Sequence, residues 1–340
     1  MTQLKRWAVP AAVLLVLAAP MLAGVVKKSK SQVTFKGFGT LSMERSEQVS
    51  AEKKASDSKT DFKGKGILGK TLGSAMLRSG SGGEIIDLPA MTVTSLDPKK
   101  KEYTTRPIEK ITLGQPSGQA ESGRQAEAKP VNESDIKIIR SEFKVEDTGE
   151  TQTFNQFPCK KYAINWEAEW ENVRTGAKGT DKMTTLVWTT PMSGELQAAQ
   201  AEEMKFTQGY LKAVGLDANV LQRDVLGGQW VQLLSSMNPA NPSPSPKGQK
   251  VANELKKIEG YPIVIDGKYF AIRPEGEKKA EEEGGGGLSL GKLALGALKK
   301  KPKPGEDQEP AISYYIEIQQ LSSAPIDDAA FQIPAGYKQK

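Results

Sequence analysis

The strongest match to a catalytic motif is a glycine-rich run that ends in lysine and threonine. Residues 64–71, Gly-Lys-Gly-Ile-Leu-Gly-Lys-Thr, fit the phosphate-loop pattern GxxxxGK[ST], in which backbone amides and the lysine hold nucleotide phosphates. This chemistry needs a buried strand before the loop and a helix directly after it. Residues 51–62 are instead polar and charged, and residues 78–83 are rich in Gly and Ser. The sequence therefore predicts a flexible basic loop here, and no nucleotide as a partner.

A row of carboxylates is the second candidate for chemistry. Glu167, Glu169 and Glu171 alternate along one stretch and Asp181 follows them, so together they could present oxygen ligands to calcium. A strand with one solvated face produces the same alternation without any metal. We therefore expect a solvated strand face and no metal site.

The composition excludes most other catalytic sites. The 340 residues include no histidine and a single cysteine, Cys159, which excludes Ser-His-Asp triads, histidine zinc sites and CxxC pairs. Cys159 is expected to be a small buried hydrophobic residue. The formal net charge of +6 is too small to indicate nucleic acid as a partner. The chain is therefore predicted not to be an enzyme and to need no cofactor.

The N-terminal residues indicate export. Lys5 and Arg6 precede an uncharged run rich in Ala, Leu and Val, from Trp7 to Gly24, which ends in small residues as a secretory signal peptide does. Residues 1–24 are therefore predicted to be a signal peptide, with an uncleaved N-terminal membrane anchor as the alternative. Either form would place the protein in the periplasm or the cell envelope.

Alternating apolar and polar residues predict the strands that would position side chains. Every second residue is apolar from Tyr162 to Trp170, and again from Ile312 to Ile318. Such alternation is typical of antiparallel sheets with one solvated face. Further strands are expected at Val33–Met43, Glu84–Leu96, Tyr103–Leu113, Ile136–Glu146, Met183–Thr190 and Ile263–Ile272. The predicted fold class is α+β, with a strongly curved antiparallel sheet, or half-barrel, covered by helices.

Two segments have the spacing of helices. Gly194–Val214 is helical in composition, and Asp217–Met237 carries an apolar stripe that includes Trp230. We expect these helices to cover one side of the sheet.

Low-complexity segments interrupt the predicted domain. Insertions at residues 115–132, 238–250 and 274–310 are polar or rich in Gly, Pro and Ser, and they are predicted to be disordered within a single domain of residues 32–340. In the last insertion, leucines between Leu288 and Leu298 precede a run of lysines, so this segment could rest on an anionic membrane surface. Loose packing over the core is the alternative.

The order of several turn and strand-start motifs resembles that of a family of uncharacterised bacterial envelope proteins related to the periplasmic outer-membrane lipoprotein carriers. The motifs are Ile85–Leu88 leading to Leu96–Tyr103, Asp147–Glu150 leading to Phe157–Tyr162, Leu186–Thr190, Gly260–Ile263 and Phe331–Lys338. The resemblance implies an antiparallel half-barrel lidded by helices, with a concave apolar face able to hold an acyl chain or lipoprotein tail. These motifs are structural and transfer no catalytic residue.

The predicted function is therefore that of an exported envelope protein that binds a hydrophobic or lipid ligand between sheet and helices. The candidate partners are a lipid or lipoprotein acyl chain and an anionic membrane surface. The alternative is a structural or interaction protein with a filled core, whose basic loops contact membranes or other proteins. The side chains predicted to line the ligand site are Tyr162, Ile164, Trp166, Trp170, Trp188, Trp230, Tyr314, Ile316 and Ile318.

Overall fold

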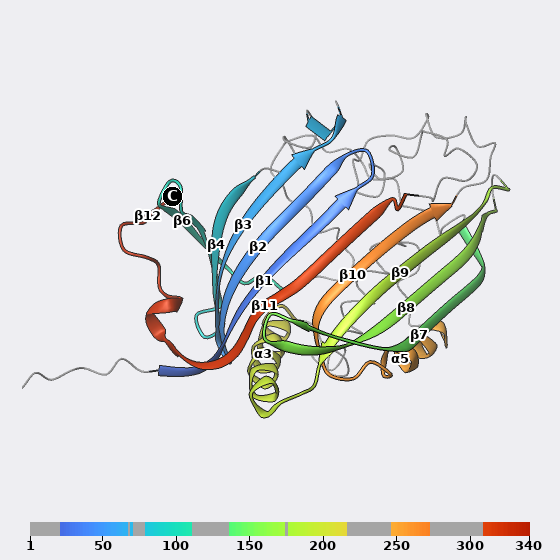
Figure 1. Cartoon of the computed structure of the whole chain (residues 1–340). Coiled ribbons are helices and arrows are strands. Elements are labelled where there is room, and N and C mark those ends of the chain that lie inside the picture. The colour runs from blue at the N-terminus through green and yellow to red at the C-terminus, as the bar shows by residue number, and fades with distance from the viewer. Residues whose placement is uncertain are drawn as a thin grey trace, which may run out of the picture.

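A computed structural model describes residues 21–66, 69–70, 79–110, 136–173, 176–215, 246–272 and 309–340. These residues form a 12-stranded sheet with the strand order β12-β6-β5-β4-β3-β2-β1-β11-β10-β9-β8-β7. Neighbouring strands are antiparallel, except that β12 pairs with β6 in parallel. Figure 1 shows one open, twisted sheet.

The elements follow one another along the chain with short turns inside each half of the sheet. The first half consists of β1 (Met21–Phe35), β2 (Gly39–Ser50), β3 (Lys53–Gly64), β4 (Gly80–Asp87), β5 (Thr92–Asp97) and β6 (Glu102–Pro107). The second half consists of β7 (Ile136–Phe154), β8 (Phe157–Asn172), β9 (Lys178–Thr190), β10 (Tyr261–Ile272), β11 (Ile312–Asp327) and β12 (Lys338–Gln339). The helical elements are α3 (Gly194–Ala213), α5 (Pro246–Leu255) and the 3₁₀ turn η4 (Asp328–Phe331).

The predicted α+β half-barrel covered by helices is wrong. Strands account for 64% of the described residues and helices for 15%, and the sheet is large and open. The helix α3 packs against β1, β2 and β11, and α5 packs against β7. The antiparallel pairing was predicted correctly, but the helical cover was overestimated because polar strands such as β3 were not recognised. Backbone hydrogen bonds to β2 and β4 hold β3 in place, although most of its side chains are polar.

Two of the expected strands are in fact hairpins. The stretch Val33–Met43 reverses between β1 and β2, where Gly37 and Gly39 have φ of 74° and 146°. The stretch Glu84–Leu96 reverses between β4 and β5, where Met91 has φ of 53°. The predicted helix Gly194–Val214 is confirmed as α3, with Ser193 as its N-cap. The second expected helix, Asp217–Met237, lies outside the described residues, and α5 begins within the predicted insertion 238–250.

The boundary expected at residue 24 falls inside a strand. The strand β1 begins at Met21 and pairs with β11 from that residue, and its pairing with β2 begins at Gly24. Val25 is fully buried in the main core cluster. The predicted insertions 115–132 and most of 274–310 lie outside the described residues. Within the described part of the chain, no helix has the length and apolar character that a membrane span requires.

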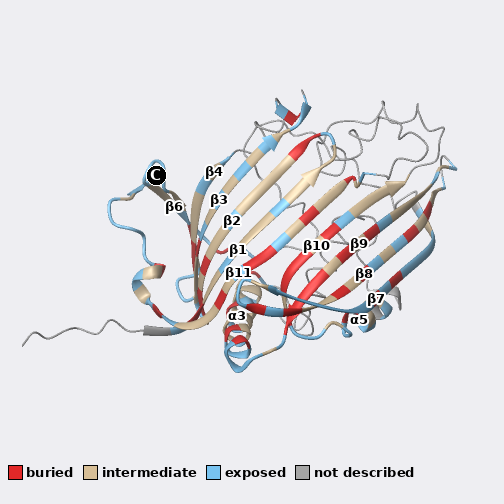
Figure 2. Ribbon diagram, viewed as in Figure 1, coloured by how far each residue is buried: buried red, intermediate tan, exposed pale blue. Residues whose placement is uncertain are grey.

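Register places α3 and α5 on the same face of the sheet, here called the helix face. Side chains at every second position share a face, and so do paired residues on neighbouring strands. Val25 packs in one cluster with Phe206 of α3. Eight residues along β1, Val33 pairs with Tyr314, which clusters with Leu255 of α5. Figure 2 shows the buried positions gathered near α3 and along β8 to β10.

The opposite face is partly covered by the tip of the β7–β8 hairpin and by η4, and it is here called the hairpin face. A bulge in β7, where residues 148–150 oppose Lys161 alone, bends the hairpin, and Gly149 adopts φ of 71° there. At the tip, Asn155 donates a hydrogen bond to Glu317 Oε1 at 3.0 Å, so the tip lies over β11. This crossing is visible beside α3 in Figure 1. The expected turn at Asp147–Glu150 is therefore a bulge within β7, and the chain reverses later, at the tip.

Both edges of the sheet are shielded. At the β7 edge, the Val145 backbone N–H donates to the Glu254 carboxylate of α5 at 2.9 Å. At the other edge, the short C-terminal strand β12 pairs with β6. Covered edges prevent the pairing with other chains that an open strand invites.

Candidate functional site

Most of the predicted ligand-lining residues share the helix face. Tyr162 and Ile316 lie in one register row that runs through β9 and β10, and Ile164 and Tyr314 lie in the next row. Trp166 and Trp170 alternate with these along β8 and therefore share their face. Ile318, two residues beyond Ile316, packs in the cluster that includes α3. Trp230 lies outside the described residues.

Tyr314 is a packing residue that lies across two strands. Its register partner is Gly267, and a Cβ on that glycine would lie 2.5 Å from Tyr314 Cε1 and closer still to Cζ and Oη. Beyond the glycine, the Tyr314 hydroxyl hydrogen-bonds the Thr185 hydroxyl, with 2.7 Å between the oxygens. The phenol ring therefore occupies the space above Gly267 and reaches β9, and its hydroxyl is satisfied inside the protein.

Trp170 is packed in the same manner at the other end of β8. It pairs with Gly179 of β9, and a Cβ on that glycine would lie 2.7 Å from the indole Cε2. Tyr162 and Ile164 are buried in the cluster under α5. These predicted site residues therefore build the core that supports the face.

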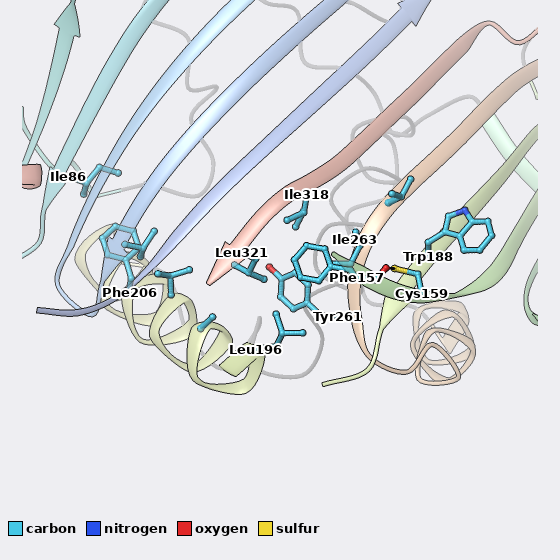
Figure 3. Packing of buried hydrophobic residues seen from close by; sticks show 14 of the residues in the cluster. Ile86, Phe157, Cys159, Trp188, Leu196, Phe206, Tyr261, Ile263, Ile318 and Leu321 are labelled. Carbon is cyan, nitrogen blue, oxygen red and sulfur yellow. Dashed lines mark hydrogen bonds between the residues drawn. The ribbon is translucent and has the colours of Figure 1, made fainter. Parts of the chain in front are cut away.

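Trp188 lies on the hairpin face and not with the other predicted residues. It pairs with Lys161 and with Val264, whereas Tyr162 pairs with its neighbour Val187. Its ring centroid is 5.1 Å from that of Phe154 at the hairpin tip, in an edge-to-face arrangement. Figure 3 shows Trp188 near Cys159 and Ile263 in this part of the core.

Cys159 is a buried residue of the same cluster, as expected. Its side chain is 3% exposed, and its thiol contacts the Phe157 carbonyl oxygen at 3.3 Å. Burial raises the pKa of the Cys159 thiol to about 11. A thiol with such a pKa is largely protonated at neutral pH and is a poor nucleophile.

Between the regions packed by α3 and α5, the helix face keeps a set of apolar side chains that remain partly accessible, here called the apolar stripe. Register connects them: Ile316 and Met43 flank Ser31 in one row, and the next row contains Val33 and Leu41. All are half-buried except Ile316, which is 37% exposed. The stripe consists of Val33, Leu41, Met43, Phe62, Tyr269, Ile312 and Ile316.

Sequence reasoning missed the part of the stripe on β2 and β3. Leu41 and Met43 alternate with Thr40 and Ser42, which is the signal of a strand with one apolar face. The signal was hidden because the turn at Gly37–Gly39 was included in a single expected strand. Trp166 is half-buried on the same face and packs beside the cluster under α5.

One end of the helix face carries an ionic cluster beneath α3. Lys27 Nζ lies 2.9 Å from Glu203 Oε1, and the Tyr261 hydroxyl donates to Glu203 Oε2 at 3.2 Å. Burial by itself lowers the pKa of Lys27, but Tyr261, Glu203 and Glu47 outweigh it and hold that pKa above its usual range. The cluster therefore ties α3 to β1 and to the start of β10.

Glu47 is the buried carboxylate of this cluster. It lies 2.6 Å from Lys54 Nζ and 3.2 Å from Arg45 Nε. Burial raises the pKa of Glu47, but Lys54, Lys27 and Arg45 together lower it below its usual range. The carboxylate is therefore ionised at neutral pH, and surrounding cations balance its charge.

The glycine-rich run of residues 64–71 has a packing explanation. Gly64 ends β3, whose side chains are largely exposed or half-buried in an antiparallel pair, so the loop does not follow a buried strand. The Lys65 backbone N–H donates to the Phe38 carbonyl at 2.8 Å, and a Cβ on Gly69 would lie 2.9 Å from the Phe38 carbonyl carbon. Glycine is therefore required where this loop touches the β1–β2 turn. Residues 67–68 and 71–78 lie outside the described residues.

The carboxylates of β8 and β9 fall on different faces. Glu167 and Glu169 occupy the hairpin face, whereas Asp181 pairs with Ala168 and shares the helix face. Glu169 lies 3.9 Å from Arg140 of β7. Within the described ranges, no cluster of acidic or cysteine side chains has the grouping that a metal ion would need.

Comparisons with known proteins place the chain beside none of them. No family model, no curated protein and no solved structure matches it. Function must therefore be argued from the chain's own residues.

Proposed function

We propose that the protein is an exported envelope protein, without catalytic activity, that binds the acyl chain of a lipid or lipoprotein on the apolar stripe. The observation that carries the proposal is the accessibility of apolar side chains in consecutive register rows, with Ile316 37% exposed. Most alternating sheet faces bury such residues or replace them with polar ones. An extended apolar face with accessible side chains marks a binding surface.

The dimensions of the stripe favour a long, thin ligand. From β10 to β3 it crosses β11, β1 and β2, a width of about 19 Å at the usual strand spacing. A fully extended acyl chain can lie along such a row of side chains. Each methylene removed from water contributes about 0.8 kcal/mol, so affinity should rise roughly fourfold per methylene buried.

The N-terminal segment and the resemblance to lipoprotein carriers support this choice of ligand. A secretory signal or anchor at residues 1–24 would bring the chain to a compartment where acyl chains and lipoproteins occur. The carriers hold such chains on an apolar face of an antiparallel sheet. In this protein the corresponding surface is the open stripe, because Tyr162, Ile164, Trp170 and Tyr314 are already packed.

The test is uptake of a fluorescent fatty acid, combined with native mass spectrometry of the gently purified protein. The wild-type protein should bind the probe, should carry co-purified lipid, and should bind longer fatty acids more tightly in competition. Ile316→Asp and Leu41→Asp place a charge in the stripe and should weaken binding at least tenfold.

Ser42→Asp is the matched control because Ser42 neighbours Leu41 on the same strand but points to the hairpin face. It should leave binding unchanged, with circular dichroism showing that every variant is folded. Absence of bound lipid in the wild-type protein, or equal affinity in folded stripe and control variants, would refute the proposal.

A further inference from the structure

The strand β12 brings lysines from the two ends of the sequence's folded region to one edge of the sheet. The Lys338 backbone N–H donates to the Lys101 carbonyl at 2.9 Å, and the Lys340 N–H donates to the Tyr103 carbonyl at 2.9 Å. The C-terminal lysines therefore lie beside the turn between β5 and β6. The resulting lysine edge consists of Lys99, Lys100, Lys101, Lys338 and Lys340.

These lysines are exposed and mostly unpaired. In the part of the chain that the structure describes, Lys100 forms the ion pair of this group, with Asp97 at 3.9 Å. Asp97 is already engaged, because its Oδ1 accepts hydrogen bonds from the backbone N–H groups of Lys99 and Lys100. Asp97, Glu102 and the terminal carboxylate are fewer than the lysines, so the edge carries a net positive charge.

Apolar and aromatic side chains accompany the lysines. The segment that leads into β12 exposes Ile333, at 38%, and contains the half-buried Tyr337. Tyr103 is half-buried on the neighbouring strand β6. Lysine, tyrosine and an exposed aliphatic residue on one edge form the combination found where proteins touch the headgroup layer of a membrane.

We infer that the lysine edge docks on the anionic headgroups of a lipid bilayer. The argument is charge complementarity together with the exposed Ile333, and it depends on β12 pairing with β6 and not on the apolar stripe. A nucleic acid is disfavoured as the occupant because the edge is short and the chain's overall charge is +6. This site is separate from the Leu- and Lys-rich insertion, residues 288–301, which lies outside the described residues.

The experiment is sedimentation of the full chain with vesicles of phosphatidylcholine, with or without phosphatidylglycerol. The measured quantity is the ratio of binding to anionic and to neutral vesicles, because an N-terminal anchor would bind both alike. The variant Lys99→Ala/Lys338→Ala/Lys340→Ala keeps the backbone pairing of β12 and removes the charges. It should reduce the ratio by on the order of 100-fold, and added salt should do the same to the wild-type protein.

A matched control removes as many lysines from the end of β3. Lys59→Ala/Lys63→Ala/Lys65→Ala changes exposed residues far from β12 and should leave the ratio within about threefold of wild type. Three results would overturn the inference. They are a wild-type ratio near one, equal losses in both variants, and loss on deleting residues 274–310 with no loss in the lysine-edge variant. Binding to heparin without binding to vesicles would also overturn it.

Discussion

Replacing Gly267 by alanine tests the packing of Tyr314 directly. The new Cβ would lie 2.5 Å from Tyr314 Cε1 and closer to Cζ and Oη, so the ring must move away. Overpacking of this kind costs about 1–3 kcal/mol. The movement also breaks the 2.7 Å bond to Thr185, whose side chain is 1% exposed. An unsatisfied buried hydroxyl costs about 1–3 kcal/mol, so we expect the free energy of unfolding to fall by about 2–6 kcal/mol.

The assay is equilibrium urea unfolding followed by tryptophan fluorescence, performed as a double-mutant cycle with Tyr314→Leu. With the ring removed, Gly267→Ala should be nearly neutral, because alanine restricts the unfolded chain more than glycine does. Gly80→Ala in β4 is the control, since nothing lies within 4 Å of the position its Cβ would take. An equal cost for Gly267→Ala with and without Tyr314 would refute the reasoning.

Two further predictions concern buried ionisable groups. Glu47→Gln leaves Lys54 and its neighbours without their carboxylate and should lower the free energy of unfolding by about 3–5 kcal/mol at neutral pH, against less than about 0.5 kcal/mol for the exposed Glu44→Gln. Because the pKa of Glu47 is lowered in the folded protein, its contribution is present above the unfolded value of about 4.3 and is lost as the pH falls through the folded value. Denaturation curves should therefore converge in acid, and a difference that persists there would contradict the assignment. Cys159, with a pKa raised to about 11, should react with a thiol reagent at pH ~8 far more slowly in the native protein than in urea; equal rates would show that it is accessible.

Local sequence pattern was sufficient where a strand is strongly apolar on one side. The alternation in β8 and β11 gave both their existence and their buried side chains correctly, because Tyr162, Ile164 and Tyr314 face a packed core. The same reasoning failed for β3. Its alternation is mostly of polar residues, and its strand character comes from backbone pairing with β2 and β4, which no local pattern reports.

The composition of the candidate site depended on register, which the sequence does not reveal. Trp188 was grouped with Tyr162, yet the pairing of Tyr162 with Val187 puts Trp188 on the other face. The pairing of Gly267 with Tyr314 likewise turns an apparent ligand contact into a packing residue. Leu41 and Met43 entered the stripe only after the β1–β2 turn had been placed.

The central position of β1 governs when this chain can fold. The strand β1 is made first, yet one of its edges is completed only by β11, near the end of the chain. The strands β1 to β6 form one antiparallel block and β7 to β10 another, and β11 is the seam that joins them. Until that seam arrives, an apolar edge in the N-terminal block stays open, and such edges aggregate. A chain synthesised or threaded across a membrane from its N-terminus must therefore be kept apart from its neighbours until its last strands emerge.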